Sequence, residues 1–400
     1  MSQAKLRLFN SNSRMEAVQS PVIPVIGELI ARHPGTISLG QGVVSYPPPP
    51  EAIASITEFL ANPINHKYQA VDGISSLITA IKTKLRVENQ IEVEGNNSVV
   101  VTAGSNMAFM NAILAIASAG DEIILNTPYY FNHEMAITMV NCQPVLVETD
   151  ANYQLQPKAI ASAITDKTKA VVTISPNNPT GVVYSPSALA EVNQLCRERG
   201  IYHISDEAYE YFTYEGVKHF SPAALAGSEH HTISLFSLSK AYGFASWRIG
   251  YMVIPQHLLM SVKKVQDTNL ICPPVISQYA ALGALKAGIS YCQNYLSDIA
   301  LIREQLLQKL SSISDLCMVA PTAGAFYFFL KIKAEISDFE LTKQLIKKHR
   351  VAVIPGSTFG MKHGCYLRVA YAALEASIAV EASDRLVMGL RESIDSIANN

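Results

Sequence analysis

The feature that most constrains the fold is a regular alternation of short β-branched runs and helical stretches between about Asn97 and about Ile254. Near-continuous apolar strands separated by helices indicate an α/β fold with a mostly parallel seven-stranded sheet, covered on both faces. One of the intervening helices is expected to have Ser185 as its N-cap and Pro186 at its first position. The runs that predict strands are SVVVTAG (98–104), DEIILNTP (121–128), QPVLVETD (143–150), KAVVTISP (169–176), GIYHISDE (200–207), HTISLFSLS (231–239) and RIGYMVIP (248–255).

The pattern changes after Pro255. Long helical stretches follow, and then come the strand-like runs GAFYFFLKI, VAVIPG and CYLRVAYA, the helical ELTKQLIKKHR and a closing helix. This pattern predicts a smaller α+β domain, made by the C-terminal third together with the first fifty residues. The proline-rich SYPPPPEA (45–52) is expected to mark the passage into the large domain. The expected units are an N-terminal arm with part of the small domain, the large domain, and the remaining small domain, over 1–48, 49–285 and 286–400.

Composition excludes several classes of function. The chain has 400 residues, of which 49% are hydrophobic, enough for one large or two modest domains. A formal net charge of −2 argues against nucleic acid and anionic membranes as partners. We find no signal-peptide pattern and no run apolar enough to span a membrane, so a cytoplasmic location is expected. The cysteines have no metal-ligand spacing and are expected to be reduced and buried: Cys142, Cys196, Cys272, Cys292, Cys317 and Cys365.

Groups with useful chemistry follow several predicted strands, at the carboxyl ends where parallel sheets bind ligands. Lys240 stands just past one strand, Ser105 begins a helix after another, NNPTG (177–181) follows a third, and Asp206 ends a fourth. Each feature alone has an ordinary explanation, because loop lysines and Asn-Pro turns are common. A buried carboxylate, however, needs a cationic partner. A pyridine ring with a phosphate and an aldehyde meets all these demands, because the helix start suits a phosphate and the lysine can form a Schiff base.

The motifs also resemble those of a known family. SLGQG, VTAGSNMAF, SPNNPTG, SDEAYE, SLSKAYG with WRIG, GAFYFF, VIPGSTFG and YLRVAYA stand in the order and at about the spacing of class I/II pyridoxal-phosphate aminotransferases of fold type I. The resemblance runs from about residue 15 to about residue 390, and as a set the motifs are highly specific. It is nearest to the branch that contains aromatic aminotransferases of microbes and plants.

The resemblance implies a role for each matching residue. Lys240 matches the lysine that forms the Schiff base with pyridoxal 5′-phosphate, and Asp206 matches the carboxylate that pairs with the pyridinium nitrogen. Tyr209 and Asn178 match residues that hydrogen-bond the phenolic oxygen of the ring, and Tyr130 matches an aromatic ring stacked on it. Lys240, Asp206 and Tyr209 are thus the predicted catalytic residues. The positions expected around the phosphate are Gly104, Ser105, Asn106, Ser237 and Arg248.

Contacts with the substrate and with a second subunit follow from the same resemblance. Arg368 matches the arginine that binds the α-carboxylate of the substrate, Gly40 lies in the loop beside it, and Asn178 is the third expected substrate contact. Tyr68 matches a tyrosine that reaches the phosphate in the partner subunit, so the active unit is expected to be a homodimer. The implied substrates are an amino acid and a 2-oxo acid, and no metal is implied.

Elementary chemistry agrees with these roles. An arginine forms a bidentate pair with a carboxylate, which orients one bond at the substrate Cα perpendicular to the ring. Asp206 would keep the pyridine protonated, so the ring accepts negative charge from Cα. Lys240, once displaced by the amino acid, is a free amine that can carry the Cα proton. A second 2-oxo acid reverses the sequence, so ping-pong kinetics are expected.

Two features bear on the amino donor. The loop after SLGQG reads VVSYPPPP, and Val43, Val44 and Tyr46 are expected to make it apolar. Aspartate-preferring relatives often carry a lysine where Asn106 stands. Both features favour an aromatic or other apolar donor, such as Phe, Tyr, Trp or Met, over aspartate. The aromatic run Phe326–Phe329 is interpreted as core or pocket wall.

Alternative functions remain open at this point. Lys240, Asp206 and Arg368 would serve a β- or γ-lyase or a cyclopropane-forming synthase on the same scaffold equally well. A transaminase that uses aspartate or another donor is also open. A cofactor-binding transcription regulator is disfavoured, because the fifty residues before the large domain are too few and too weakly basic for a DNA-binding domain.

Overall fold

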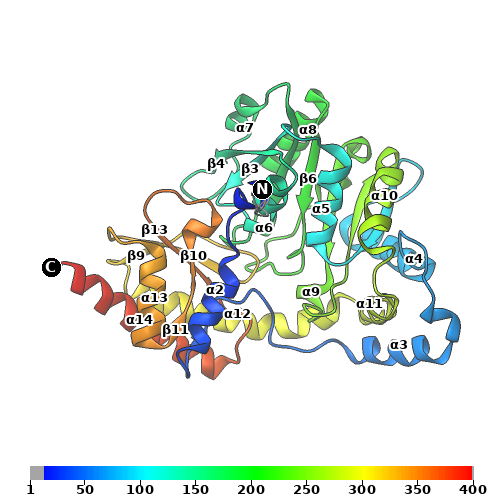
Figure 1. Cartoon of the computed structure of the whole chain (residues 1–400). Coiled ribbons are helices and arrows are strands. Elements are labelled where there is room, and N and C mark those ends of the chain that lie inside the picture. Colours follow the sequence, from blue (N-terminus) through cyan, green and yellow to red (C-terminus); the bar gives the residue numbers. More distant parts are fainter. Residues whose placement is uncertain (1–12, 399–400) are drawn as a thin grey trace, which may run out of the picture.

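The computed structural model describes residues 13–398, which form a large domain around one sheet and a smaller domain beside it (Figure 1). The strands of the large sheet stand in the order β2-β8-β7-β6-β5-β3-β4. β8 pairs antiparallel with β2 and β7, and the other neighbours are parallel, which confirms the predicted mostly parallel seven-stranded sheet. The strand bounds are β2 Asn97–Thr102, β3 Glu122–Thr127, β4 Gln143–Glu148, β5 Thr168–Ile174, β6 Tyr202–Asp206, β7 Thr232–Ser237 and β8 Gly250–Pro255.

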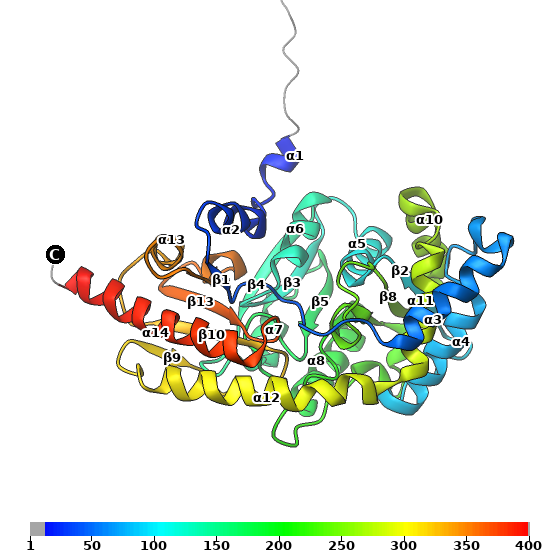
Figure 2. The same cartoon turned by 90° about the horizontal axis from the view of Figure 1, so that it is seen from below.

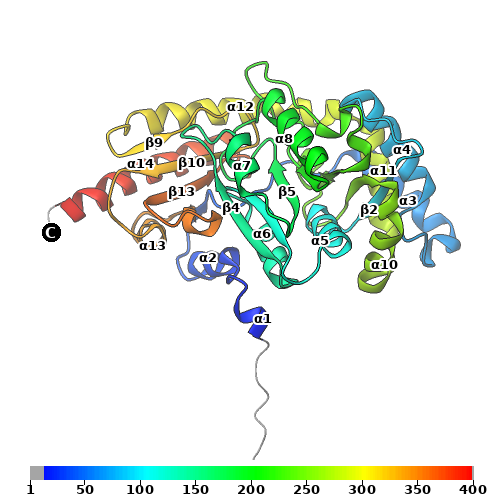
Figure 3. The ribbon, with the colours of Figure 1, turned by 90° about the horizontal axis from the view of Figure 1, so that it is seen from above.

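Helices cover both faces of this sheet, as Figure 3 shows. Ile123 and Leu125 of β3 pack in one hydrophobic cluster, with α5 and α6, while Ile124 between them packs in another, with α7 and α8. Successive side chains of a strand point to opposite faces, so a strand covered on both sides must be apolar throughout. The helices of this domain are α3 Pro50–Ala61, α4 Ser75–Lys84, α5 Ser105–Ile116, α6 Phe131–Met139, α7 Pro157–Ala163, α8 Pro186–Arg199, α9 Leu238–Ala241, α10 Leu259–Leu270 and α11 Val275–Ala287.

The smaller domain is built on a four-stranded antiparallel sheet of order β12-β13-β10-β9. The chain start joins this domain, because β1 pairs in parallel with β11 and α2 packs against α13. This pairing supports the proposed 1–48 unit, of which residues 1–12 lie outside the described part. The bounds are α1 Ser13–Glu16, α2 Val22–Ala31, β1 Ile37–Ser38, α12 Ile289–Ser311, β9 Cys317–Val319, β10 Tyr327–Ile332, α13 Asp338–His349, β11 Val351–Ala352, β12 Ile354–Pro355, β13 Cys365–Ala370 and α14 Ala376–Ala398.

The long helix α12 joins the two domains. Figure 2 shows it running beneath both, with α14 beside it on the side of the smaller domain. It contacts α14 at one end, and α9 and α11 of the large domain toward the other. Within residues 13–398, every helix is too short or too polar to cross a membrane. All six cysteines are buried and unpaired, as expected from the sequence.

Local predictions were largely confirmed, and the strand ends of the large sheet differ from the predicted ones by at most two residues. Ser185 caps α8 by accepting a hydrogen bond from the Ala188 N–H, and Pro186 is its first residue. The last predicted strand begins at Gly250 rather than at Arg248, because Arg248 has a left-handed backbone with φ of 51°. The first predicted strand ends at Thr102, two residues before its predicted end at Gly104, whose φ is 81°.

The strand order explains where a site forms. The carboxyl ends of β3, β5, β6 and β7 meet at one edge of the sheet, together with that of β2. Because β8 is antiparallel to its neighbours, its beginning lies at the same edge, next to the ends of β2 and β7. Residues just after five strands and just before a sixth are thereby gathered in one place.

Candidate functional site

A cavity of about 120 Å³ lies at this edge of the sheet. It brings together most of the residues that the sequence predicts for the cofactor, although they span more than 140 positions of the chain. The lining residues are Ser105, Asn106, Tyr130, Ile174, Asn178, Asp206, Ala208, Tyr209, Ser237, Ser239, Lys240 and Arg248. Gly104 directly precedes the first of them, whereas Gly40 and Arg368 reach this group through Asn178, as described below.

Lys240 enters the cavity from the short helix α9, which begins directly after β7. Ser237 caps this helix, since its hydroxyl accepts a hydrogen bond of 3.2 Å from the Ser239 N–H. The Lys240 amine donates to the Gly42 carbonyl at 2.5 Å. Burial, together with the nearby charge of Arg368, lowers the pKa of Lys240 to about 8. The amine is therefore much closer to neutral than a surface lysine.

Tyr46 hydrogen-bonds the backbone of α9 and so holds this helix in place. Its hydroxyl donates to the carbonyls of Lys240 and Ala241, at 3.0 and 3.2 Å, and its ring stacks on Tyr295 at 4.2 Å. It is buried in the core and does not line the cavity, so its ring adds no apolar surface to the pocket. The reason is that its hydroxyl satisfies backbone carbonyls of the helix that carries the lysine.

Asp206 ends β6 and is almost completely buried, at 4% exposure. One carboxylate oxygen accepts a hydrogen bond of 3.1 Å from the Ala208 N–H, and the other lies 3.1 Å from Nε2 of His133. His133 comes from α6, and its ring stacks on Phe109 at 3.9 Å. The sequence analysis missed His133, because a single histidine within a helix carries no pattern that points to a distant carboxylate.

Asn178 links Tyr209 to Arg368. Its amide donates to the Tyr209 hydroxyl at 3.2 Å, and its amide oxygen accepts from Nη1 of Arg368 at 3.0 Å. Nη2 of Arg368 donates to the Gly40 carbonyl at 2.6 Å. The guanidinium lies over the rings of Tyr327 and Phe359, at 4.7 and 5.1 Å. Arg368 is 3% exposed, so the charge is buried but partnered on several sides.

The smaller domain fixes the position of Arg368. It sits in β13, paired with Phe329 of β10 on one side and Ile354 of β12 on the other. The loop that carries Gly40 lies beside it, because Leu39 donates to the Ala352 carbonyl and accepts from the Ala370 N–H. The arginine and its carbonyl partner are therefore both held by backbone hydrogen bonds of one sheet region.

The start of α5 forms the other end of the cavity. Among the described residues no side chain caps this helix, so its first backbone N–H groups are available to a ligand. Arg248 lies beside it and donates to the Ala245 carbonyl at 2.9 Å. A Cβ at Gly104 would come within 2.5 Å of Nη2 of Arg248, and φ is positive there, so glycine is needed.

Tyr130 lies between the two ends of the cavity. Its hydroxyl accepts a hydrogen bond of 2.8 Å from the Asn132 amide and lies 3.4 Å from the Asn106 amide oxygen. Its ring packs edge-on against His133, at 5.2 Å between centroids. Burial raises the pKa of the Tyr130 hydroxyl, so the group stays neutral.

Tyr68 does not lie in the cavity of its own chain. Its side chain is 80% exposed, in the segment between α3 and α4. The structure therefore places every other predicted site residue at or next to the cavity, and Tyr68 on the surface.

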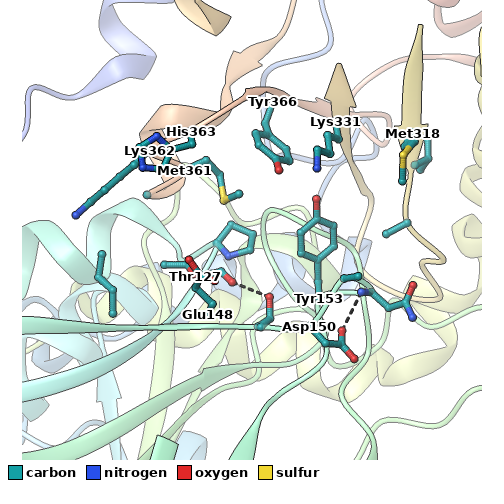
Figure 4. Close-up of a pocket in the computed structure, with 18 of the residues that line it drawn as sticks. Thr127, Glu148, Asp150, Tyr153, Met318, Lys331, Met361, Lys362, His363 and Tyr366 are labelled. Atoms are coloured by element: carbon teal, nitrogen blue, oxygen red, sulfur yellow. Dashed lines mark hydrogen bonds between the residues drawn. The ribbon is translucent and has the colours of Figure 1, made fainter. Parts of the chain in front are cut away.

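A second cavity, of about 680 Å³, lies between the ends of β3 and β4 and the sheet of the smaller domain. Figure 4 shows Glu148 and Asp150 on one side of it and Lys331, Lys362 and His363 on the other. None of the predicted site residues lines this space. The candidate site is therefore the smaller cavity, in which the predicted groups converge.

Comparison with known proteins now identifies the family. The family model for aminotransferase class I and II matches residues 34–386. This chain belongs to the class I and II aminotransferases. The aromatic aminotransferase ISS1 of Arabidopsis thaliana is 32% identical over 93% of this chain and 94% of its own length. The aspartate aminotransferase of Pyrococcus abyssi is 32% identical over 95% of this chain and 98% of its own length. A solved single mutant of the Thermus thermophilus aspartate aminotransferase has a TM-score of 0.88, with 27% identity over 96% of this chain and all of that one.

Aminotransferases of this family use pyridoxal phosphate, and the cavity suits that group. The start of α5 and Arg248 offer an anion site at one end. Asp206 is a buried carboxylate that faces the cavity, and Lys240 is a partly buried amine with a lowered pKa that lines the same cavity. A phosphate, a ring nitrogen and an aldehyde on one small molecule match these three groups in kind.

Proposed function

We propose that this aminotransferase moves the amino group of an aromatic or other apolar L-amino acid to a 2-oxo acid, with pyridoxal phosphate held in the smaller cavity. The observation that carries the proposal is the convergence of Lys240, Asp206 and Arg368 from two domains on one buried site. When bound, pyridoxal phosphate supplies an aldehyde that takes up the amino group and a ring that accepts negative charge from Cα.

The phosphate end has several donors. They are the first N–H groups of α5 and the hydroxyls of Ser105 and Ser237. Arg248 adds a full positive charge at the same end of the cavity. Helix starts and guanidinium groups both favour phosphate oxygens. These groups would hold the phosphate without blocking the lysine.

Asp206 and Tyr209 would hold the pyridine ring of pyridoxal phosphate. Asp206 would pair with the ring nitrogen, and its contacts with Ala208 and His133 keep the carboxylate in one orientation. Tyr209 and Asn178 would hold the phenolic oxygen from the other side of the cavity. A fixed charge that needs no rearrangement is the most effective way to stabilise charge that develops in the reaction.

Arg368 would bind the α-carboxylate of the substrate, and Lys240 would move the proton at Cα. The planar guanidinium lies over the rings of Tyr327 and Phe359, which hold it in a position suited to a bidentate pair with a carboxylate. A pKa of about 8 lets the Lys240 amine take up and release a proton near neutral pH.

The charges around the cavity support an apolar donor. Among the described lining residues, the cationic ones are Lys240 and Arg248, and Arg368 lies just beyond Asn178. All three have a use in binding the cofactor or the α-carboxylate. Asn106 stands at the position where a further cation would meet a side-chain carboxylate. The relatives include both aromatic and aspartate aminotransferases, so their names alone favour neither donor.

A homodimer is part of the proposal. Tyr68 is exposed, and the same stretch of chain carries two other exposed apolar side chains, Leu60 at 58% and Ile64 at 51%. Exposed apolar groups that gather in one region mark association surfaces. We infer that a second copy covers this region, and the family resemblance assigns Tyr68 to the partner's phosphate site.

The test is an absorption spectrum of the purified protein loaded with pyridoxal phosphate, recorded while single amino acids are added. Loss of the visible band with phenylalanine, tyrosine, tryptophan or methionine, and not with aspartate, is expected. A response to aspartate or glutamate alone would reverse the donor assignment. Release of a 2-oxo acid without equimolar conversion of the cofactor to its amine form would show a lyase instead.

Two variants make this test specific. Lys240→Ala should lose the band and all turnover, since no other lysine lines the cavity among the described residues. Lys218→Ala, at an exposed lysine outside the cavity, is the matched control and should behave like the wild type. Turnover at the wild-type rate in Lys240→Ala would refute the site.

A further inference from the structure

Tyr327 contributes a hydrogen bond to the site in addition to its aromatic ring. It is the first residue of β10, its side chain is fully buried, and its hydroxyl lies 2.7 Å from the Tyr209 hydroxyl. The two rings meet edge-on, at 79° and 5.5 Å between centroids. The interpretation of the aromatic run as core or pocket wall describes the ring of Tyr327 but not this hydrogen bond.

The hydrogen-bond inventory decides which hydroxyl donates. A tyrosine hydroxyl has one proton to donate and can accept. The Asn178 amide already donates to the Tyr209 oxygen. Among the described residues, Tyr209 is the only hydrogen-bond partner of the Tyr327 hydroxyl. If Tyr209 donated to Tyr327, the Tyr327 proton would be buried without an acceptor, which is costly. The favoured arrangement is therefore donation from Tyr327 to Tyr209.

This arrangement leaves the Tyr209 proton directed elsewhere. Its oxygen accepts from both Asn178 and Tyr327, so its own O–H is free to donate into the cavity that Tyr209 lines. Donation from Tyr327 also polarises the Tyr209 O–H and makes it a stronger donor.

Close packing keeps the Tyr327 hydroxyl in place. A Cβ at Gly42 would come within 2.3 Å of the Tyr327 oxygen, so the loop backbone lies directly against it. The Arg368 guanidinium lies over the ring, at 4.7 Å from the centroid. The same loop residue, Gly42, accepts the hydrogen bond of Lys240. Tyr327 therefore contacts Arg368, proposed for the α-carboxylate, and lies against Gly42, the residue that Lys240 hydrogen-bonds.

We propose that Tyr327 is a positioning residue, which donates a hydrogen bond to Tyr209 and so directs the Tyr209 proton toward the phenolic oxygen of bound pyridoxal phosphate. The inference rests on the proposed function. A donor to this oxygen favours its negatively charged form. Loss of the Tyr327 hydroxyl should weaken that donor, and the bound cofactor should then hold its proton up to a higher pH.

The test is the variant Tyr327→Phe, which keeps the ring and removes the hydroxyl. We expect the pH midpoint of the visible absorption change of the cofactor-loaded protein to rise by about half a unit to one unit, the size of one hydrogen bond. The charged and titratable groups around the cavity are the same in both proteins: Asp206 with His133 behind it, Tyr130, Tyr209, Lys240, Arg248 and Arg368.

Two further variants separate positioning from packing. Tyr371→Phe removes the hydroxyl of another fully buried tyrosine, which packs on Phe328, and should leave the midpoint unchanged. Tyr209→Phe should itself raise the midpoint, and adding Tyr327→Phe to it should give no further shift. An unchanged midpoint in Tyr327→Phe, or an equal shift with and without Tyr209, would overturn the inference. Absence of any visible band in the loaded wild-type protein would instead refute the proposed function.

Discussion

The two ends of the candidate site are built differently, although each has one arginine. At the phosphate end, formed by the start of α5, Ser237 and Arg248, the arginine is exposed and donates to a carbonyl three residues away. At the carboxylate end, formed by Arg368, Asn178 and Gly40, the arginine is 3% exposed. Its partners lie 190 and 328 positions away in the chain. The phosphate end is thus exposed and built from contacts close in sequence, and we call it the open end. The carboxylate end is buried and built from contacts far apart in sequence.

This difference shows how each end stabilises the positive charge of its arginine. An exposed guanidinium remains hydrated, so Arg248 needs no elaborate set of partners before an anion arrives. A buried guanidinium is expensive unless its hydrogen bonds are made, so the Arg368 site has to be assembled when the protein folds. We therefore expect the carboxylate end to be preorganised and the phosphate end to be completed only when pyridoxal phosphate binds.

The largest expected effect is at the preorganised end. Arg368→Ala should lower kcat/KM for the amino acid by about 10²- to 10³-fold, because it removes the proposed partner of the α-carboxylate from a buried site. Binding of pyridoxal phosphate should be nearly unchanged. Steady-state kinetics and a cofactor titration measure the two quantities separately. Arg391→Ala is the control, since that arginine is 49% exposed and pairs with Asp315 on the surface.

A loss of cofactor binding in Arg368→Ala that matched the loss of kcat/KM would break the comparison. It would mean that the two ends do not act separately, and that the arginine holds the whole cavity together. The same result in Arg391→Ala would point to a general loss of stability.

At the open end a smaller effect is expected. Arg248→Ala should weaken binding of pyridoxal phosphate by about 10- to 100-fold, the range for losing a hydrogen bond to a charged group. At saturating cofactor, kcat should stay near the wild-type value, because Arg248 is proposed to bind the phosphate and not the substrate. Equilibrium titration of the cofactor-free protein measures the binding. A large fall in kcat with unchanged cofactor binding would contradict the assignment of Arg248 to the phosphate.

The comparison also explains what sequence reasoning can reach. The alternation of strands and helices predicted the sheet, and each group at the phosphate end follows or precedes a strand that the alternation reveals. Lys240 and Asp206 were found in the same way. Arg368 was assigned from a resemblance, because nothing near it in sequence shows that it meets Asn178.

The groups that sequence reasoning missed share one property. His133 contacts Asp206 from a different helix, and the Tyr327 hydroxyl contacts Tyr209 across the two domains. Both contacts depend on how separate elements pack, which periodicity does not encode. The left-handed backbone of Arg248 was missed for another reason, since non-glycine residues seldom adopt that conformation.

A second copy of the chain would sharpen the comparison further, because the proposal adds Tyr68 of a partner to the open end only. Tyr68→Ala should weaken cofactor binding by about tenfold, the lower end for a charged hydrogen bond. When it is co-expressed with Lys240→Ala, mixed dimers should contain one complete site each. At limiting cofactor, activity should recover to about a quarter of the wild-type value if subunits pair at random.

The outcome that counts against a shared site is equally clear. Activity in the mixture that equals only the average of the two separate variants would show that Tyr68 does not serve a partner. Tyr68 would then be an exposed residue without a part in the site.

The smallest effect concerns Lys240, which both ends influence. Burial, and after it the charges of Arg368 and Arg248, lowers the pKa of this amine to about 8. Only the neutral amine attacks an aldehyde, so the rate at which cofactor-free protein recombines with pyridoxal phosphate should rise with pH and level off above about pH 8. Removing a positive charge favours the protonated amine, so Arg368→Ala should move this midpoint upward, and Arg248→Ala should move it less. A midpoint that moves more in Arg248→Ala would mean that the open end, and not the preorganised one, controls the lysine.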